Sequence, residues 1–404
     1  MTSPAHVLIV DDLEVNRDLL ARRVQRLGHT IAFAASGREA LVRLRATSFD
    51  LVLLDITMPD MDGYEALAQI KSDPSLAPIP VVMVTAIDGV DSVVRCLELG
   101  AEDYITKPFN PVVLRARIES SLNKKRVADL NARLLQSMSR EMAIAQRIQL
   151  GFLPDSLPQL PGWPMAATCV PAKQVGGDFF DAWVLDDGLL AFAVADVCDK
   201  GVGAALYMAL FRSLLRISLQ QAPPGQPAAQ RLERAVAFTN DYVATVHARD
   251  NMFATTFVAI VDPASGRMDY INAGHDAALL LRQGQVQSQS LPPQGLALGM
   301  MAGQAHRACC TRISAGDRLL VYSDGLPEAL SPQNQDFGEE RVREAVAWPA
   351  DSPQTLLTSI RCALDSHVGD REPHDDVTLL CLFHSVPGRS SVPSNGASRT
   401  RWPS

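Results

Sequence analysis

Residues 175–201, VGGDFFDAWVLDDGLLAFAVADVCDKG, decide how the second half of this 404-residue chain is interpreted. Two alternating apolar runs flank Asp186-Asp187-Gly188, which is a strong turn signal, and the stretch therefore predicts a β-hairpin. If the turn is centred on Asp187, position 180 faces 194, 182 faces 192 and 184 faces 190. The same register places Asp178 opposite Asp196 at the open end of the hairpin.

Asp178 and Asp196 would then be like charges in direct opposition at the edge of an apolar face. Such a pair destabilises a sheet unless a counter-charge lies between its members. A divalent cation would supply that charge. Gly176-Gly177 and the turn-forming segment 199–201 leave room for the close approach of backbone, water and substrate. The alternative is a surface hairpin whose two acids are only solvated.

The composition is that of a globular protein, with 47% hydrophobic and 20% charged residues. The chain is long enough for two domains, and its net charge of −8 gives no overall basic field for nucleic acid or anionic membranes. No apolar run approaches the roughly 20 residues that span a bilayer, and His6–Val10 is too short for a signal peptide. Seven scattered cysteines without a CxxC pair favour a reduced, cytoplasmic protein.

Residues 5–122 alternate short strand-like runs with amphipathic helical segments. The expected strands are His6–Val10, Thr30–Ala34, Leu51–Asp55, Val81–Thr85 and Asp103–Ile105. The expected helices lie near 14–28, 37–47, 62–72, 89–99 and 111–122. This alternation predicts a doubly wound, five-stranded parallel sheet of the α/β class, with helices on both faces and a ligand site at the carboxyl ends of the strands.

Polar side chains converge on that edge of the sheet. Asp11 and Asp12 end the first strand, Asp55 ends the third, Thr85 ends the fourth, and Lys107 follows the fifth. Carboxylate oxygens suit Mg²⁺, and an aspartate beside that ion can act as a nucleophile toward phosphoryl groups. Thr85 and Lys107 would hold the oxygens of the product by hydrogen bond and charge.

The stretches VDDLEVNR, LVLLDITMPDMDGYE, VTA and YITKPF closely resemble the receiver domain of bacterial response regulators. The resemblance implies that Asp55 is the phospho-acceptor and that a sensor histidine kinase is the partner. It implies a Mg²⁺ site formed by Asp11, Asp12, Asp55 and the Thr57 carbonyl.

The same resemblance implies Thr85 and Tyr104 as the switching pair. Lys107 would contact the phosphoryl group, and the bond before Pro108 is expected to be cis. The alternative is a receiver that never becomes phosphorylated.

The segment Pro111–Leu150 is predicted to be helical throughout, because it contains no later proline and no glycine before Gly151. Beyond Leu122, apolar residues recur every three or four positions and form one stripe. They are Val127, Leu130, Leu134, Met138, Met142, Ala145 and Ile148. A coiled coil in a homodimer is favoured, and the alternative is packing onto a domain of the same chain. Gly151 and Pro154 are expected to end the helix.

From Asp155 the pattern changes to period-two strands with two helices, a buried one at Ala204–Leu219 and an amphipathic one at Ala228–His247. Further strands are expected at Ala254–Val261, Met268–Ala273, Ala278–Arg282, Arg318–Tyr322 and Val377–Phe383. This pattern predicts an α+β domain in which two sheets are covered by helices, an α/β sandwich. The predicted boundaries are a first domain at 1–122, a helical linker at 123–153, a second domain at 154–386 and a disordered tail at 387–404.

Further carboxylates of the second domain stand at strand ends. LLVYSDGLPEA ends a strand at Asp324, and HDDVTLLCLF begins one with Asp375 and Asp376. Together with the hairpin acids and without a histidine or cysteine cluster, they favour Mg²⁺ or Mn²⁺ over zinc. Two such ions about 4 Å apart would clamp a phosphoryl group and activate a water for in-line attack. No Walker loop or kinase signature appears, which favours hydrolysis over transfer from a nucleotide.

From about residue 140 to 385 the chain resembles the PPM-type metal-dependent serine/threonine phosphatases, in the bacterial branch that regulates sigma factors by partner switching. The resemblance rests on AQRIQLGFLP, GGDFFD, ADVCDKG, MFATTFVAIVD, INAGHDAALLL, YSDGLPEA, FGEERV and DDVTLL. It implies that two Mn²⁺ or Mg²⁺ ions are held by Asp178, Asp196, the Val197 carbonyl, Asp324 and Asp375, with Asp376 adjacent. The implied substrate is a phosphorylated anti-sigma-factor antagonist protein.

The chain departs from that family at several positions. Cys198-Asp199 stands where the family often has Ser-Gly, and Cys198 is interpreted as a packing residue. Asp276 replaces the asparagine of a Gly-His-Asn motif, and His275 is interpreted as a turn or packing residue. Lys173 is a candidate contact for the substrate phosphate, and the alternative is a solvated lysine.

The favoured hypothesis is a phosphatase controlled by phosphorylation of Asp55, with the signal carried by the long helix and its junction near 146–154. The alternative is a catalytically weak docking module that sequesters a partner protein. A transcription factor lacks support, because no basic recognition helix follows the first domain.

Overall fold

The computed structural model describes residues 4–86, 90–223 and 225–385. The chain divides into two compact units, Met1–Ser139 and Arg140–Ser404, which are described separately. The predicted tail at 387–404 lies outside the described residues.

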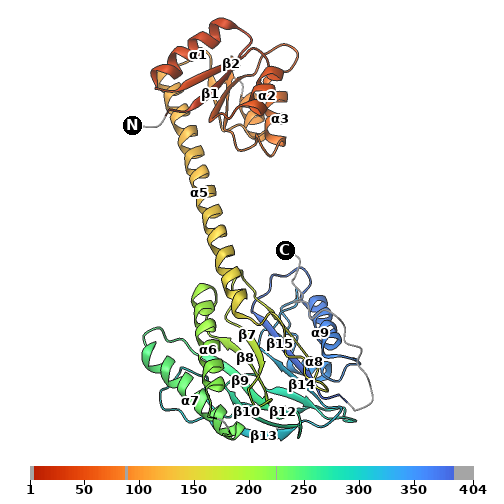
Figure 1. The fold of residues 1–404 in the computed structure, drawn as a ribbon. Helices are drawn as coiled ribbons and strands as arrows, with labels where there is room; N and C mark the ends of the chain where they lie inside the picture. The colour runs from red at the N-terminus through yellow and green to blue at the C-terminus, as the bar shows by residue number, and fades with distance from the viewer. Residues whose placement is uncertain (1–3, 87–89, 224, 386–404) are drawn as a thin grey trace. The chain divides into compact units, whose positions relative to one another are not determined.

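The first unit contains a parallel sheet with the strand order β2-β1-β3-β4-β5 (Figure 1). The strands are β1 (His6–Val10), β2 (Thr30–Ala34), β3 (Leu51–Asp55), β4 (Val81–Thr85) and β5 (Asp103–Thr106). The helices are α1 (Glu14–Arg26), α2 (Gly37–Ala46), α3 (Gly63–Ser72), α4 (Val90–Glu98) and the start of α5 (Pro111–Phe152). Separate apolar clusters pack on the two faces of the sheet, so the predicted doubly wound class is confirmed.

Capping residues set the start of two of these helices. Ser36 accepts a hydrogen bond from the Glu39 amide of α2, and Asp62 accepts one from the Glu65 amide of α3. Both pairs satisfy amides that a helix N-terminus otherwise leaves without partners. Helix α3 therefore starts directly beside the acidic edge of the sheet.

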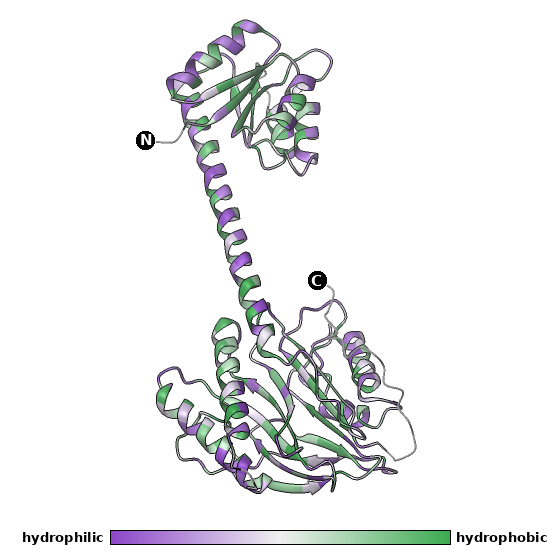
Figure 2. Cartoon of the chain, in the orientation of Figure 1, coloured by the Kyte–Doolittle hydropathy of each residue, from purple (hydrophilic) through white to green (hydrophobic). Residues whose placement is uncertain are grey.

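Helix α5 has 42 residues and follows the prediction closely, except at its end. Leu114, Ile118 and Leu122 are buried within the first unit. Beyond them, the apolar residues recur along the helix among hydrophilic ones (Figure 2). The prediction that Gly151 ends the helix is wrong, because α5 continues to Phe152, two residues before Pro154.

The second unit is a sandwich of two five-stranded antiparallel sheets, with the orders β13-β10-β9-β8-β7 and β12-β11-β14-β15-β6. The first sheet contains β7 (Phe179–Val184), β8 (Leu190–Val197), β9 (Ala254–Val261), β10 (Arg267–Ala273) and β13 (Cys309–Arg312). The second contains β6 (Met165–Val170), β11 (Ala278–Leu281), β12 (Gln289–Leu291), β14 (Arg318–Tyr322) and β15 (Val377–Phe383). An apolar cluster fills the space between the sheets.

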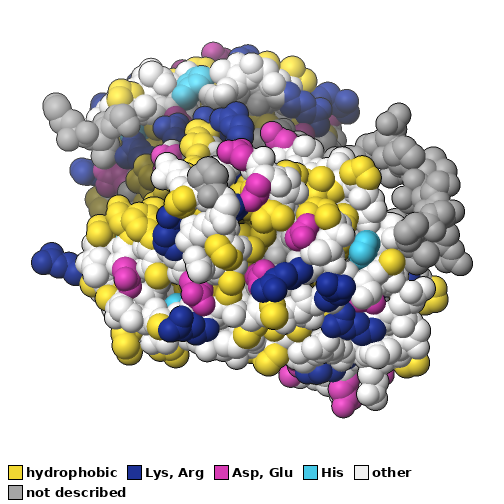
Figure 3. Space-filling model, turned by 60° about the horizontal axis from the view of Figure 1, so that its bottom comes forward, with side chains coloured by type: hydrophobic (Ala, Val, Ile, Leu, Met, Phe, Trp, Pro, Cys, Tyr) yellow, Lys and Arg dark blue, Asp and Glu magenta, His cyan; other side chains and the backbone are white. Residues whose placement is uncertain are grey.

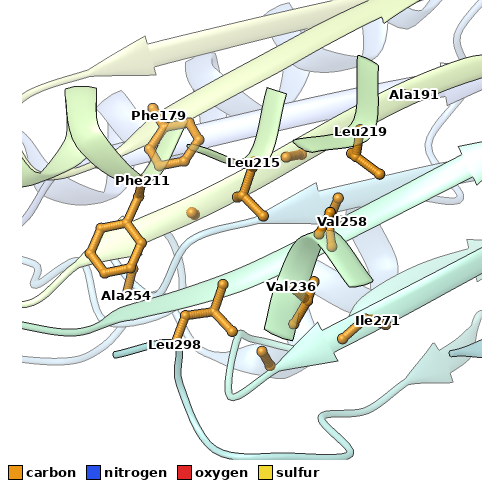
Figure 4. Packing of buried hydrophobic residues seen from close by; sticks show 14 of the residues in the cluster. Phe179, Ala191, Phe211, Leu215, Leu219, Val236, Ala254, Val258, Ile271 and Leu298 are labelled. Carbon is orange, nitrogen blue, oxygen red and sulfur yellow. The ribbon is translucent and has the colours of Figure 1, made fainter. Parts of the chain in front are cut away.

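Helices cover the outer faces of both sheets (Figure 1). Helices α6 (Val202–Gln220) and α7 (Ala228–Val246) pack on the first sheet, and α8 (Glu339–Ala345) and α9 (Pro353–Val368) pack on the second. Figure 4 shows the first of these interfaces, including Phe211, Leu215 and Leu219 of α6 with Phe179, Ala191 and Val258 of the sheet. The predicted α/β sandwich is confirmed.

The hairpin has the predicted register: Phe180 pairs with Val194, Ala182 with Phe192, and Val184 with Leu190. One face of the hairpin packs between the two sheets, and the other face packs under α6. Both faces of the hairpin are therefore buried. Asp181, on the face toward α6, is compensated by Arg212 at 2.9 Å and Arg216 at 2.8 Å.

Helix α6 differs from the predicted helix that is buried on most sides. Five residues on one side are buried, whereas Leu206 on another side is 67% exposed. Its length and apolar composition would suffice for a membrane span, but its buried side belongs to the core of the second unit. Strands β6, β12 and β13 lie at sheet edges and helix α8 is short, and none of them was predicted. Helix α9 was also missed, although Leu356, Ile360 and Leu364 recur at helical spacing after the N-cap Ser352.

Candidate functional site

The acidic cluster of the first unit lies at the carboxyl ends of β1 and β3. Carboxylate oxygens of Asp11, Asp12 and Asp55 lie within 4.8 Å of one another. Lys107 Nζ lies 2.8 Å from Asp11 Oδ2 and 2.7 Å from Asp55 Oδ1. Burial raises the pKa of Asp55, and the neighbouring Asp11 and Asp12 raise it further, whereas Lys107 opposes the shift. One ammonium facing three carboxylates leaves an excess of negative charge that a divalent cation fits.

The other residues predicted for this site lie in the neighbouring strands or directly after them. Thr85 ends β4 and is buried, Tyr104 lies half-buried in β5, and Thr57 is exposed after β3. The Lys107-Pro108 bond is cis, as expected. Gly63 was not singled out from the sequence, yet a Cβ there would lie 2.2 Å from the Asp55 carbonyl oxygen. Glycine is therefore required where α3 approaches the end of β3 that carries Asp55.

The second group of carboxylates gathers where corresponding ends of the two sheets meet. Asp178 precedes β7, Asp196 lies in β8, Asp324 follows β14, and Asp375 and Asp376 precede β15. Ser323 Oγ donates a 2.6 Å hydrogen bond to Asp178 Oδ2 and thereby joins one sheet to the other. Asp196 and Asp178 interact by a side-chain hydrogen bond, whereas within the described residues no three side chains of this group bring their oxygens within 4.8 Å of one another.

The carboxylates of the second unit raise one another's pKa. Burial, followed by the charge of Asp196, holds the pKa of Asp178 well above its ordinary value. Burial and Asp324 raise the pKa of Asp196 to about 6, and burial and Asp375 raise that of Asp324. Either protonation or cations between its members would relieve the repulsion in such a chain of buried like charges, and its all-oxygen donor set suits Mg²⁺ or Mn²⁺.

Asp375 and Asp376 differ sharply in their surroundings. Asp376 is 4% exposed, and its carboxylate accepts hydrogen bonds from the amides of Ala172 at 2.8 Å and Gly177 at 2.7 Å. Asp375 is partly exposed and forms an ion pair with Lys200 at 2.8 Å. Asp376 thus organises the loop before β7, while the carboxylate of Asp375 is more open to a ligand.

Gly176 and Gly177 permit backbone to approach this group of carboxylates closely. A Cβ at Gly176 would lie 2.1 Å from Asp376 Oδ2, and one at Gly177 would lie 2.5 Å from the Val197 carbonyl oxygen. Larger residues would therefore displace the loop that carries Asp178.

The unusual residues of this unit occupy defined places. Cys198 Sγ accepts a hydrogen bond from the Phe253 amide, and burial raises the pKa of its thiol. His275 bonds to Thr255 through Nδ1 at 2.9 Å, and burial lowers its pKa to about 4, so it is neutral at pH 7. Burial and neighbouring acids raise the pKa of Asp276 to about 7. Lys173 is exposed on the loop before Gly176.

Sequence reasoning missed three residues that contact this site: Ser323, Lys200 and Gln149. Gln149 of α5 donates to the Gly176 carbonyl through Nε2 and accepts from the Gly176 amide through Oε1 at 3.2 Å. Lys200 and Ser323 stand inside quoted motifs, which marks them as candidates without revealing their partners.

Charges of both signs are interspersed on the face of the molecule shown in Figure 3.

Comparisons with known proteins agree with this division. Residues 7–119 match the family described as Response regulator receiver domain, and residues 186–384 match Stage II sporulation protein E (SpoIIE). The second match includes Asp196, Asp324, Asp375 and Asp376 and begins after Asp178.

Similar proteins resemble one or the other part. Protein IcfG of Synechocystis sp. (strain ATCC 27184 / PCC 6803 / Kazusa) is 35% identical over 61% of this chain and 42% of its own length. A probable transcriptional regulator, ycf27 of Cyanidium caldarium, is 43% identical over 32% of this chain and 50% of its own length. The chain thus spans half or less of these relatives. The solved SiaA-PP2C domain of Pseudomonas aeruginosa shares the fold at 19% identity, with a TM-score of 0.52, over 62% of this chain and 98% of that domain.

The two matches show what each part of the chain is similar to, and the second unit shares the fold of a solved PP2C domain. More specifically, the chain joins a response regulator receiver domain to a SpoIIE-family domain.

Proposed function

We propose that this protein is a two-component response regulator whose output domain removes phosphate from phosphoserine or phosphothreonine in a protein, under the control of phosphorylation at Asp55. The observation that carries the proposal is the gathering of Asp178, Asp196, Asp324 and Asp375 from four strands of two sheets. Burial and mutual repulsion raise the pKa values of these carboxylates, which is typical of a site for divalent cations.

We propose the metal ligands that the family resemblances imply. Asp11, Asp12, Asp55 and the Thr57 carbonyl would hold Mg²⁺ in the receiver. Asp178, Asp196, the Val197 carbonyl, Asp324 and Asp375 would hold two Mn²⁺ or Mg²⁺ ions in the phosphatase. Bound ions would neutralise the phosphoryl oxygens and lower the pKa of a water for in-line attack.

The protein's own residues hold this arrangement in place. Ser323 fixes one oxygen of Asp178, and Asp376 fixes the loop that leads to it. Lys200 holds Asp375 from the turn that follows Asp196. In the receiver, Lys107 is placed to contact a phosphoryl group on Asp55, with Thr85 and Tyr104 as the switching pair.

We further propose domain boundaries at 1–122 for the receiver, 123–153 for the linker and 154–386 for the phosphatase. The proposed partners are a sensor histidine kinase, a phosphorylated anti-sigma-factor antagonist, and a second copy of this chain bound through α5. A cytoplasmic location fits these partners. The two hydrogen bonds of Gln149 to Gly176 support α5 as the route of control, because they join its C-terminal turns to the loop before Asp178.

The test is release of phosphate from a phosphoserine protein by the purified full chain with Mn²⁺. Wild type should release phosphate, and EDTA should stop it. Asp196→Asn should lose activity by at least about a hundredfold, since it removes a charge on which both ions depend. Asp186→Asn, in the exposed turn of the same hairpin, is the matched control and should retain activity.

If wild type and Asp196→Asn are equally inactive with Mn²⁺ and Mg²⁺, the phosphatase proposal is wrong. The docking module would then be the remaining interpretation. If the activity is present but identical with unmodified Asp55 and with its beryllofluoride adduct, only the proposed control by phosphorylation fails.

A further inference from the structure

A cleft of about 510 Å³ lies on the outer face of the second sheet, beside the candidate metal-binding carboxylates. Its floor contains the neighbouring strand pairs Val170–Val377 and Thr168–Leu379 of β6 and β15. Its walls come from α9, from the turn after β14 and from the segment 369–375. Two of these walls, the turn after β14 and the segment 369–375, are next to or contain candidate metal-binding carboxylates.

Two residues connect the cleft to that site. Gly325, directly after Asp324, and Asp375, a candidate metal ligand, both line it. A Cβ at Gly325 would lie 2.0 Å from the Asp376 carbonyl oxygen, so the backbone is tightly packed at this border. If Asp324 and Asp375 hold cations that bind the phosphoryl group, the flanking residues of the phosphoprotein would lie at the mouth of the cleft.

The wall formed by residues 369–375 is fixed at both ends. Lys200 Nζ donates to the His374 carbonyl at 2.7 Å and pairs with Asp375 at 2.8 Å. Arg371 Nη1 donates to the Ser331 carbonyl at 2.9 Å. The cleft is thus preformed, and a ligand would spend little free energy in ordering it.

Apolar surface inside the cleft and acidic groups on its border define the kind of ligand. Val170, Val368 and Val377 are half-buried and leave apolar area facing the cleft. Glu328 and Glu372 on the border are exposed and form no ion pair within the described residues. The two lining arginines already have partners, because Arg361 lies 3.6 Å from Asp365 and Arg371 also donates to Asn334.

We propose that this cleft binds an apolar side chain of the phosphoprotein substrate, with a basic residue beside it, and so selects the substrate. The inference rests on the proposed phosphatase function and specifies how that site recognises its protein. Glu328 and Glu372 would attract the basic residue, and the valines would cover the apolar side chain.

The test compares phosphoserine peptides hydrolysed by the full chain with Mn²⁺. The peptides share an alanine background with two arginines, and a single leucine is moved from six residues before to six residues after the phosphoserine. At one or two positions, leucine should raise kcat/KM about tenfold over alanine, mainly through KM, because about half of a leucine side chain would leave water. p-Nitrophenyl phosphate, which has no flanking residues, measures the chemistry alone.

Val368→Glu places a charge in the cleft and should bring the leucine-to-alanine ratio close to one. Ser366→Glu introduces the same charge on the exposed side of α9 and should leave the ratio unchanged. Replacing both arginines of the peptide by glutamate should lower kcat/KM further.

A wild-type enzyme that hydrolyses every peptide equally well overturns the cleft assignment and leaves the phosphatase proposal standing. A leucine preference that survives Val368→Glu also overturns it. So does a preference that appears only after removal of residues 386–404, which would assign the cleft to the chain's own C-terminal segment. Absence of activity on all peptides and on p-nitrophenyl phosphate would instead refute the proposed function.

Discussion

At the scale of single residues, the carboxylates were predictable and their supporting partners were not. Strand periodicity predicts that Asp11, Asp55, Asp178, Asp196 and Asp324 stand at strand ends. Neighbouring strands that end at the same edge of a sheet bring such residues close together. The partners come from distant parts of the chain, and no local pattern encodes their pairing. Ser323, for example, bonds to a carboxylate 145 positions away. The separate role of Asp376 also emerges only from its hydrogen bonds to backbone amides.

Asp376 and its neighbour Asp375 should respond differently to substitution. Asp376→Ala leaves the amides of Ala172 and Gly177 without their acceptor, so the free energy of unfolding should fall by about 2 kcal/mol. Asp375→Ala breaks a partly exposed ion pair and should cost below about 1 kcal/mol. Urea unfolding in EDTA measures both. Equal losses would contradict the assignment of Asp376 to loop support.

Asp276→Asn should stabilise the metal-free protein at neutral pH. A carboxyl whose folded pKa is raised from 3.8 to about 7 binds more protons when folded, so its contribution to stability falls as the pH rises through this window. The asparagine side chain does not ionise, so the variant does not lose this stability as the pH rises. Its advantage should be absent below about pH 4 and reach about 2 kcal/mol above pH 7, after allowance for partial exposure. Urea unfolding in EDTA at pH 4, 6 and 8 measures it, and an advantage independent of pH would contradict the raised pKa.

At the scale of elements, period and turn chemistry predicted the hairpin to the residue and all five receiver strands within one residue. The helices show the limits of such patterns. The sequence of α6 is apolar on most sides, and only its packing shows which side the sheet covers. Glycine often ends a helix, but α5 continues through Gly151. The helix ends three residues after Gln149, whose side chain bonds to Gly176.

Those two bonds predict an effect of Gln149→Ala on the loop before Asp178. Losing them should speed hydrogen exchange at the Gly176 and Gly177 amides about tenfold, corresponding to about 1.4 kcal/mol of local stability. It should also shrink the activity difference between unmodified Asp55 and its beryllofluoride adduct. Gln136→Ala, at an exposed position of the same helix, is the control. Unchanged exchange at both glycines would show that α5 does not hold this loop.

At the scale of the whole molecule, the sequence predicts two domains, and the two compact units divide within α5 at Ser139. It predicts less about assembly, because an apolar stripe indicates that a partner exists without identifying it. Within the first unit, Val127, Leu130, Leu134 and Met138 of this stripe are each 53–62% exposed. A second copy of the chain is the partner that we propose for this stripe, and packing onto a domain of the same chain is the alternative.

The proposed dimer predicts that the full chain sediments at twice its mass at micromolar concentration. Leu134→Glu would bury a charge in the helix pair at two symmetric positions and remove two leucine contacts, each worth about 2 kcal/mol. It should therefore shift the chain to monomer, whereas Gln136→Glu, at an exposed position about 200° around the helix from Leu134, should not. Phosphorylation is the second variable of this experiment. A receiver can act on the proposed dimer through α5 only if its unmodified and phosphorylated states favour different arrangements of the helix pair. Beryllofluoride should then change the dissociation constant of wild type. A wild-type chain that is monomeric with and without beryllofluoride would leave the stripe without its proposed partner, and the signal would have to pass along a single helix.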